Sequence, residues 1–309
     1  MDYSLHQLRI YLKVVERQSI TKAADELYLT QPAVSIQLKK FQEQFSVPLT
    51  EVVGKKLYVT DFGKEVAAHA QKILEDIEAL DYKTKSFKGQ LAGKMRVSVV
   101  STGKYVMPFF LSDFLRQNSA VDLVMDVTNK TQVVKSLEHN EVDFSLVSTI
   151  PEQLSLHTIQ LMSNKLYLVG GTCINRNPNL PIKKIFERYP LLFREEGSAT
   201  RLSMEKFIAE KSLPTFKKIE LTSNEAVKQA LIAGLGYSIM PLIGIKNELK
   251  NNDLEIVPFR GLPIISYWHL IWLKAKKMSP IADAYLKFIK AEKDRIIKDS
   301  FGWYERYNK

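Results

Sequence analysis

Cysteine is nearly absent from this chain of 309 residues, which contains only Cys173. A single cysteine excludes an intrachain disulfide, a thiol–disulfide switch within one chain and a zinc site built on several cysteines. Long apolar runs are also missing, and none approaches the ~20 residues that a membrane-spanning helix needs. The N-terminus lacks a basic segment followed by an apolar one, so we do not expect secretion. These absences predict a cytoplasmic protein without membrane contact.

The motifs of common enzymes are missing as well. No Walker loop, no His-Glu-x-x-His pair and no Gly-x-Ser-x-Gly turn occurs in the sequence. The five histidines are scattered without metal-ligand spacing, and Gly234-x-Gly236 lacks the third glycine of a dinucleotide fingerprint. The sequence therefore predicts neither an enzyme nor a bound metal or cofactor.

The charge of the chain is basic but unevenly divided. There are 44 Lys and Arg against 34 Asp and Glu, a formal net charge of +10. Residues 1–94 hold 14 basic and 12 acidic residues, whereas residues 95–309 hold 30 and 22. A nucleic-acid role for the N-terminal region must therefore rest on a motif rather than on charge. The C-terminal excess indicates solubility or the attraction of an anionic small molecule.

Residues 1–60 show the pattern of short helices with tight connections. Ser4 and Gln7 form a capping-box pair, and apolar residues follow them at helical spacing. A second helix is expected over residues 21–28, and a third begins at Thr30 with a proline in its first turn. Residues 52–59, around a Gly-Lys-Lys turn, indicate a short β-hairpin.

Residues 19–40 predict a helix, a tight turn and a second capped helix, with two small alanines where the helices cross. The exposed start of the second helix offers Gln31, Ser35 and Lys39. In a helix-turn-helix, such side chains meet base edges in the major groove of DNA, while lysines and caps contact phosphates. A plain helical hairpin inside an all-α domain is the alternative interpretation.

Residues 61–88 predict one long helix. Its apolar residues recur in steps of three and four, close to a heptad seam. They are Phe62, Val66, Ala70, Ile73, Ile77 and Leu80. At ~1.5 Å per residue this helix extends roughly 42 Å. A rod with one apolar stripe needs a partner, most simply its own copy, and residues 89–93 then form a flexible joint.

Residues 94–309 alternate between strand and helix patterns in two successive groups. Three expected strands alternate with helices, and the same rhythm returns between residues 191 and 240. The first three strands are expected at 95–100, 121–127 and 142–147. This is the pattern of βαβ units, so we expect a mostly parallel sheet in each of two lobes. The chain is expected to cross between the lobes near 162–165 and 266–268.

Polar side chains follow the expected strands or open the helices after them. In open α/β sheets the carboxyl ends of strands form the ligand crevice, and helix N-termini offer N–H donors to anions. The candidates are Ser101, Thr102, Thr131, Ser148, Thr149, Ser198, Thr200, Arg201, Thr222 and Asn224. As a set they suit a carboxylate or phosphate. Helix capping accounts equally well for any single one, and Arg201 is also placed to pair with Glu205.

The stretch from Ala23 to Lys39, Ala-Ala-x-x-Leu-x-x-Thr-Gln-Pro-Ala-Val-Ser-x-Gln-Leu-Lys, resembles the winged helix-turn-helix of LysR-type transcriptional regulators. The loop Glu196–Arg201 resembles one in the effector domain of that family. Asn224–Gln229, with the Gly-Leu-Gly that follows at 234–236, is similar to a helix and strand of its second lobe. The resemblance covers the whole chain.

The resemblance implies a fold and an order of domains. A winged helix-turn-helix is implied at 1–60, and a linker helix for dimerisation with its joint at 61–93. Residues 94–309 would form an α/β effector domain of two parallel-sheet lobes, similar to periplasmic binding proteins. Lobe I is expected over 94–162 and 268–309, and lobe II over 163–267. DNA contacts are implied for Thr30, Gln31, Pro32, Ser35, Lys39, Lys55 and Lys56.

The resemblance also implies a function and partners. A regulator of this type would bind double-stranded DNA in a sequence-specific way, as a homotetramer built from two dimers, and would contact RNA polymerase. Its effector would be a small anionic metabolite held between the two lobes. The rival interpretations are a solute-binding protein and a small-molecule enzyme of α/β fold without a role in DNA binding.

Overall fold

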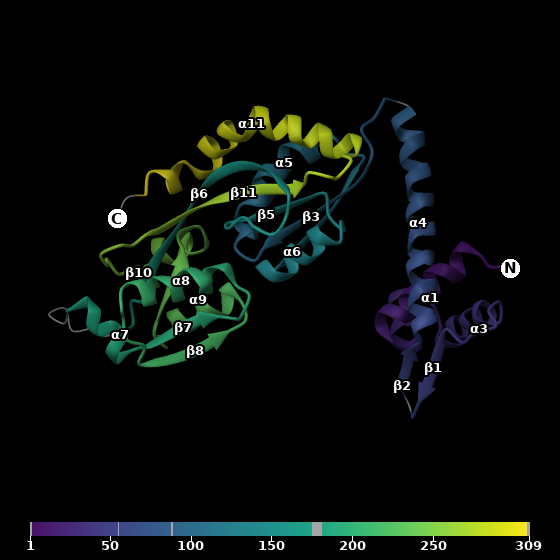
Figure 1. The fold of residues 1–309 in the computed structure, drawn as a ribbon, viewed down its shortest axis with the longest axis horizontal. Helices are drawn as coiled ribbons and strands as arrows, with labels where there is room; N and C mark the ends of the chain where they lie inside the picture. Colours follow the sequence, from purple (N-terminus) through teal and green to yellow (C-terminus); the bar gives the residue numbers. More distant parts are fainter. Residues whose placement is uncertain (1, 55, 88, 175–180, 308–309) are drawn as a thin grey trace. The chain divides into compact units, whose positions relative to one another are not determined.

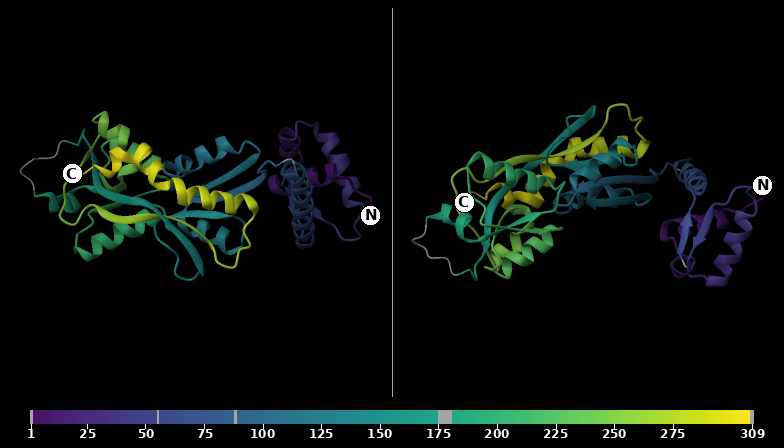
Figure 2. Two further views of the ribbon diagram at one scale, coloured as in Figure 1. Left: turned by 90° about the horizontal axis from the view of Figure 1, so that it is seen from above. Right: turned by 60° about the horizontal axis from the view of Figure 1, so that its bottom comes forward.

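The computed structural model describes residues 2–54, 56–87, 89–174 and 181–307. The chain divides into two compact units with the boundary between Gly93 and Lys94. Figures 1 and 2 show the helices and strands of both units.

The first unit consists of short helices, a two-stranded hairpin and a long helix. Its elements are α1 (Leu5–Arg17), α2 (Ile20–Glu26), α3 (Gln31–Gln42), β1 (Thr50–Val53), β2 (Lys56–Val59) and α4 (Asp61–Phe87). The side chains of Ser4, Ser19 and Thr30 each accept a hydrogen bond from the backbone N–H three residues on, which fixes where α1, α2 and α3 begin. Ser4 and Gln7 complete the predicted capping box. The predicted helix-turn-helix and hairpin are confirmed.

The core of this unit lies where α1, α2 and α3 cross. Ala23 and Ala24 are fully buried there, and their small side chains let the helices approach closely. The ring of Tyr11 packs 4.9 Å from that of Phe41, centroid to centroid, and its hydroxyl donates to the carbonyl oxygen of Gly63 at 2.7 Å. Burial raises the pKa of Tyr11 to about 12. This hydrogen bond ties the first turn of α4 to the helix-turn-helix.

The long helix α4 extends beyond that core. It begins at Asp61 as predicted and has 27 residues, so it extends about 40 Å; Lys88, the last residue of the predicted helix, lies outside the described residues. Ala67 and Ala70 pack into the core of the first unit. Farther along, Ile73 and Leu80 are 39% and 61% exposed, and they line a shallow groove together with Ile77. The C-terminal part of the predicted apolar seam therefore lies on the surface of the chain.

In its described part, the second unit is built on a nine-stranded sheet with the order β4-β3-β5-β11-β6-β9-β7-β8, and β10 pairs with β6. Its strands are β3 (Gly93–Val100), β4 (Val121–Thr128), β5 (Phe144–Val147), β6 (Leu156–Gly171), β7 (Pro190–Arg194), β8 (Lys217–Leu221), β9 (Tyr237–Pro241), β10 (Leu254–Ile256) and β11 (Ile264–Leu273). The β3–β5 pair and the pairs of β7 with β8 and β9 are parallel, as predicted for the two lobes. We expected a separate sheet in each lobe, but the structure has one continuous sheet. The long strands β6 and β11 run antiparallel to each other through both lobes and join them.

The two segments where the chain was expected to cross between the lobes pair with each other in β6 and β11. Asn164 on β6 is opposite Ser266 on β11, and its side-chain amide donates to the Ser266 hydroxyl at 3.2 Å. The register shifts between Tyr267 and His269, which marks an irregularity at the crossing. We call residues 162–166 and 264–268 the crossing segments.

Helices cover both sides of the crossing strands. They are α5 (Met107–Gln117), α6 (Lys130–Glu138), α7 (Ile185–Arg188), α8 (Ala199–Glu210), α9 (Asn224–Ile232), α10 (Lys246–Lys250) and α11 (Pro280–Glu305). Figure 1 shows α5 and α11 on one side of β6 and β11, with α6, α8 and α9 on the other. Within the described residues no helix is both long and apolar enough to cross a membrane.

Candidate functional site

The N-terminal turn of α3 presents the residues predicted to contact DNA. Thr30 caps the helix, and Gln31 and Pro32 are exposed directly after it. Ser35 is half-buried one turn on, and the side chain of Lys39 is 80% exposed, with Glu43 at 3.9 Å as a distant ion-pair partner. The core side of α3 is held by buried apolar residues, so its polar side faces outward. This arrangement presents a helix end that fits the major groove.

The hairpin supplies the expected wing. Gly54 has φ +66°, a conformation that favours glycine at this tight turn. Lys56 is exposed at the start of β2, where its ammonium group is free to approach a phosphate. Lys55, the other predicted wing cation, lies outside the described residues.

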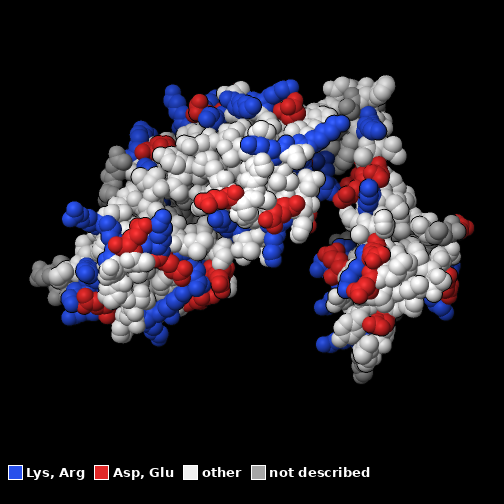
Figure 3. Space-filling model, viewed as in Figure 1, with Lys and Arg blue, Asp and Glu red and all other residues white. Residues whose placement is uncertain are grey.

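Charge alone does not distinguish a binding surface. In Figure 3 the Lys and Arg side chains on the visible faces of both units are interspersed with Asp and Glu. Some cations are engaged within the fold: Lys13 and Arg17 of α1 both pair with Glu26 of α2, which fastens the two helices together. The predicted recognition of DNA would therefore depend on the placement of a few side chains.

In the second unit, three polar residues from two lobes meet at the carboxyl ends of the strands. Ser101 follows β3 in lobe I, Arg194 ends β7 in lobe II, and Asn224 begins α9. The Arg194 guanidinium donates to the Ser101 hydroxyl oxygen at 3.1 Å, and the Asn224 amide donates to the same oxygen at 3.4 Å. We call these three residues the polar cluster. It brings Ser101 and Asn224 together as the sequence predicted, whereas Arg194 was not among the predicted residues.

Arg194 is the most unusual member of the polar cluster. Its side chain is only 4% exposed, and Nε and Nη2 donate to the Glu195 carboxylate at 2.7 and 2.8 Å. Its remaining nitrogen, Nη1, is buried and has no hydrogen-bond partner among the described residues. Because the Ser101 oxygen already accepts two hydrogen bonds, its own hydrogen is free to be donated elsewhere. The cluster therefore holds two unused donors and suits an oxyanion.

A second contact between the lobes involves Thr131, close to the start of α6. Gly197, in the loop before α8, has φ +83°, and a Cβ there would lie 2.8 Å from the Thr131 hydroxyl oxygen. Glycine is therefore required on two grounds, since the backbone conformation is left-handed and the neighbouring lobe is close. Asn129, rather than Thr131, caps α6, so the exposed Thr131 hydroxyl is not used as a helix cap.

The remaining predicted residues differ in their surroundings. Ser198 is buried and caps α8, and Thr200 is half-buried in its first turn. Thr102 is buried two residues after β3, Ser148 is half-buried and Thr222 is exposed. Ser198 thus has the helix-capping contact that was its alternative interpretation, and the effector roles of all five residues stay predictions.

Arg201 forms the ion pair with Glu205 that the sequence offered as an alternative to anion binding. Its guanidinium binds Glu205 and Glu220 at 2.8 Å each and donates to the carbonyl oxygen of Arg194 at 3.2 Å. The hydrogen bond to Glu205 is the main cause of its raised pKa. With both carboxylates bound, Arg201 supports the end of β7, and Arg194 is the better placed cation for an anion.

Thr149 lines a separate cavity of about 540 Å³ beside α8. Lys130 and Thr149 contribute from lobe I, and Leu202 and Phe207 contribute from α8 in lobe II. A ligand in this cavity would contact both lobes. Among the described residues no group of three or more His, Cys, Asp or Glu is arranged to hold a metal ion.

Comparisons with known proteins agree with this arrangement. The family model described as "Bacterial regulatory helix-turn-helix protein, lysR family" matches residues 5–64, and "LysR substrate binding domain" matches residues 88–294. The HTH-type transcriptional activator CmpR of Synechocystis sp. is 32% identical over 297 residues, which cover 95% of this chain and 97% of CmpR.

Two solved structures extend the comparison. The regulatory domain of Synechocystis PCC6803 CcmR, in complex with 2-PG, matches with a TM-score of 0.59 and 28% identity over 64% of this chain and 96% of that one. CbnR, a LysR family regulator solved with its target DNA, matches with a TM-score of 0.67 over 93% of this chain and 99% of that one. At 18% identity, CbnR supports the fold alone.

The family models cover the helix-turn-helix and most of the second unit, and the relative at 32% identity spans nearly the whole chain. Both rival interpretations are excluded, because the relatives are transcriptional regulators rather than enzymes or solute-binding proteins. The chain belongs to the LysR family of DNA-binding transcriptional regulators.

Proposed function

We propose that this regulator senses a small anion at the polar cluster between its lobes. The observation that carries the proposal is the buried guanidinium of Arg194, with one nitrogen that has no described partner. A buried N–H without a partner costs free energy, and a ligand oxygen that accepts from it recovers that cost. The Ser101 hydroxyl supplies the second donor.

The chemical class of the effector follows from the donors. The available groups donate hydrogen bonds, and the N-termini of α8 and α9 start close to the cluster in sequence, at Ala199 and Asn224. An oxyanion such as a carboxylate or phosphate is complementary to this set of donors. All of these donors come from the protein itself, so the binding that we propose needs no metal or cofactor. The complex of CcmR with 2-PG, a small anionic metabolite, supports this class for the present chain.

A ligand titration tests this proposal. The melting temperature of the wild-type protein should rise with added 2-PG, because ligand at ~100 times its Kd stabilises a protein by about 2.7 kcal/mol. Arg194→Gln and Ser101→Ala should fold but lose most of the rise. Arg260→Gln, at an exposed arginine of the same lobe, is the matched control and should behave as wild type. An equal rise in Arg194→Gln would refute the role of this cluster.

For DNA recognition we propose a division of roles on the first unit. Gln31 and Ser35 read base edges, with Thr30 and Pro32 setting the start of α3 against the groove. Lys39, Lys55 and Lys56 contact phosphates and add affinity without sequence preference. The exposure of Gln31 and of Lys39 and Lys56 supports this division.

We also propose that the regulator is a dimer through α4 and a homotetramer built from two such dimers. The exposed Ile73 and Leu80 of α4 support the dimer, since burying them against a second copy would remove apolar surface from water. Two helix-turn-helix units would then bind half-sites about one helical turn apart. Sedimentation velocity at micromolar concentration tests the assembly, and a wild-type monomer would contradict it.

The remaining proposals concern the location of the protein in the cell and its contact with RNA polymerase. A DNA-binding regulator acts in the cytoplasm of a bacterial cell, where its DNA lies. The relative CmpR is described as a transcriptional activator, which supports contact between the present chain and RNA polymerase. Transcription in vitro from a bound promoter, with and without this protein, tests that contact by the yield of transcript.

A further inference from the structure

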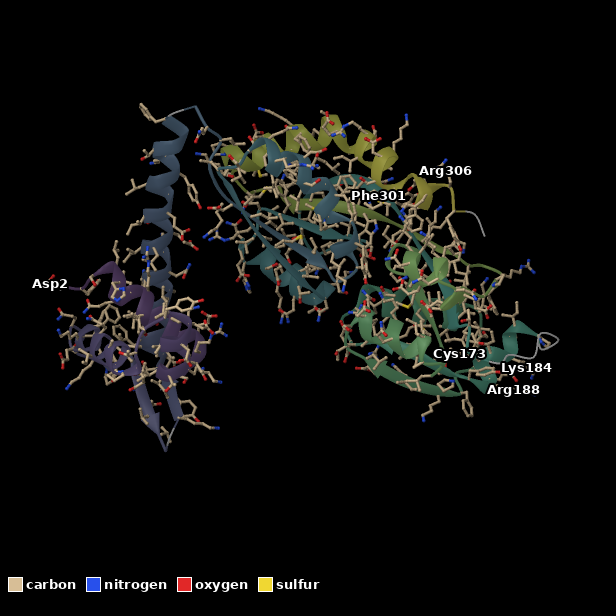
Figure 4. The ribbon with its side chains drawn as sticks, turned by 180° about the vertical axis from the view of Figure 1, so that it is seen from behind. Asp2, Cys173, Lys184, Arg188, Phe301 and Arg306 are labelled. Carbon is tan, nitrogen blue, oxygen red and sulfur yellow. The ribbon has the colours of Figure 1, made fainter. Side chains whose placement is uncertain are left out.

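The C-terminal end of α11 is rich in aromatic residues whose role the DNA-binding and effector functions do not account for. Within Phe301–Tyr307, four of seven residues are aromatic. We call this segment the C-terminal strap. It comprises the last turn of α11 and the two residues after it. Helix α11 runs along one side of the sheet from lobe I toward lobe II (Figure 1), and Figure 4 labels Phe301 and Arg306 in the strap.

The first anchor of the strap lies in lobe I. Phe301 is 2% exposed. Its ring meets that of Phe109 edge-on at 5.1 Å and stacks with that of Phe110 at 6.0 Å, both on α5. Aromatic packing of this kind fixes the strap to lobe I.

The second anchor lies on a crossing segment. The backbone N–H of Lys165 donates to the Tyr304 hydroxyl oxygen at 2.6 Å. The Lys165 ammonium group donates to the carbonyl oxygens of Tyr304, Glu305 and Tyr307 at 3.2, 3.2 and 3.3 Å. A cation at the carbonyl end of a helix is favourable because it satisfies oxygens that have no partner within the helix. Lys165 therefore closes the end of α11 onto the junction of the lobes.

The third anchor lies in lobe II. The ammonium group of Lys246, the first residue of α10, lies 4.8 Å from the ring centroid of Trp303. The ring of Tyr307 lies 6.0 Å from that of Tyr167, on the part of β6 that belongs to lobe II. The strap thus contacts lobe I, the crossing and lobe II within seven residues.

We propose that the C-terminal strap restrains the angle between the lobes, and that it sets how readily an effector separates them. Across the cleft, Arg194 and Asn224 of lobe II both bond to Ser101 of lobe I, so an anion that takes the place of these hydrogen bonds releases one contact between the lobes. A change in the lobe angle moves the strap's three anchors relative to one another. The strap therefore opposes that change, and an effector must overcome it. The coupling between the strap and effector binding rests on the proposed function, whereas the restraint of the lobe angle does not.

Hydrogen–deuterium exchange of the full chain tests the restraint without any ligand. Tyr304→Phe removes the acceptor of the Lys165 N–H, and Lys165→Met removes the ammonium group. Tyr267→Phe, at a 44% exposed tyrosine of the other crossing segment, and Lys298→Met, at an exposed lysine of α11, are the matched controls. Amides of the crossing segments should exchange about three- to tenfold faster in the two strap variants, as expected for one lost hydrogen bond. Unchanged exchange in both variants would overturn the proposal.

A ligand titration tests the coupling in the same variants. The concentration of 2-PG that gives half-saturation should fall about three- to tenfold in Tyr304→Phe and Lys165→Met, and stay at the wild-type value in the controls. An unchanged or higher value would overturn the coupling. If wild type does not bind 2-PG while the exchange result holds, the proposed effector fails and the restraint stands.

Discussion

Glu195 offers the sharpest test of how the cleft binds an anion, because its carboxylate neutralises Arg194. It accepts two hydrogen bonds from the guanidinium at 2.7 and 2.8 Å. Glu195→Gln keeps the size of the side chain and one acceptor oxygen but removes the negative charge. We expect it to destabilise the fold and to bind a small anion more tightly.

Two estimates set the magnitude of these opposed effects. Breaking a buried ion pair by changing one partner costs about 3–5 kcal/mol, and the amide oxygen of Gln keeps this cost near the lower end. The Glu195 carboxylate binds the Nε and Nη2 edge of the guanidinium, opposite Nη1. An anion bound at Nη1 of Arg194 would therefore lie roughly 7 Å from the lost carboxylate, and at an effective dielectric constant of about 20 the relieved repulsion is about 2.4 kcal/mol. Screening by water in an open cleft reduces that to roughly half, or about a tenfold lower Kd.

Isothermal titration calorimetry with 2-PG gives the Kd, and thermal melting gives the stability. Glu196→Gln is the matched control, since Glu196 is the next residue and is exposed. The Kd and the stability of Glu196→Gln should differ from wild type only by the small effect of removing one exposed negative charge. If Glu195→Gln folded but bound 2-PG no more tightly than wild type, the anion would not lie beside Arg194.

Three further predictions concern other parts of the molecule. Gln31→Ala should cost about 1–3 kcal/mol on the specific DNA site and blur sequence preference, whereas Lys56→Ala should weaken all DNA alike and lower the salt slope by about one; fluorescence anisotropy against specific and random duplexes separates the two. Ile77→Asp should shift the sedimentation coefficient toward that of a monomer, because a charge would be buried unpaired in the α4 interface; a dimer of unchanged stability would argue against that interface. Gly197→Ala should lower the free energy of unfolding by about 1–2 kcal/mol, because its φ of +83° disfavours a Cβ that would also press on Thr131; an unchanged melting temperature would show that the loop relaxes freely.

Local signals in the sequence predicted much of the fold. The capping box at Ser4 and the apolar steps along residues 61–88 depend on neighbours within one or two turns, so the pattern alone identifies the helices. The mixed sheet was not fully predictable. Asn164 and Ser266 pair across 102 residues of sequence, and no periodicity within β6 or β11 encodes that pairing.

The candidate site was predictable in location but not in its central residue. Ser101 and Asn224 were identified because polar residues at strand ends are a local signal. Arg194 was missed, although a charged residue ending the apolar strand β7 was a signal that was present in the sequence. The choice between Arg194 and Arg201 depends on which carboxylates lie nearby in space, and Glu220 is 19 residues from Arg201 in sequence.

We expect that an anion bound at Arg194 changes how this LysR-family regulator binds DNA. A DNase footprint on the DNA upstream of its own gene, with and without 2-PG, measures this effect in wild type and Arg194→Gln. 2-PG should alter the wild-type footprint, while Arg194→Gln should protect the same DNA and not respond. A footprint that responds equally in both proteins would show that the response does not depend on Arg194.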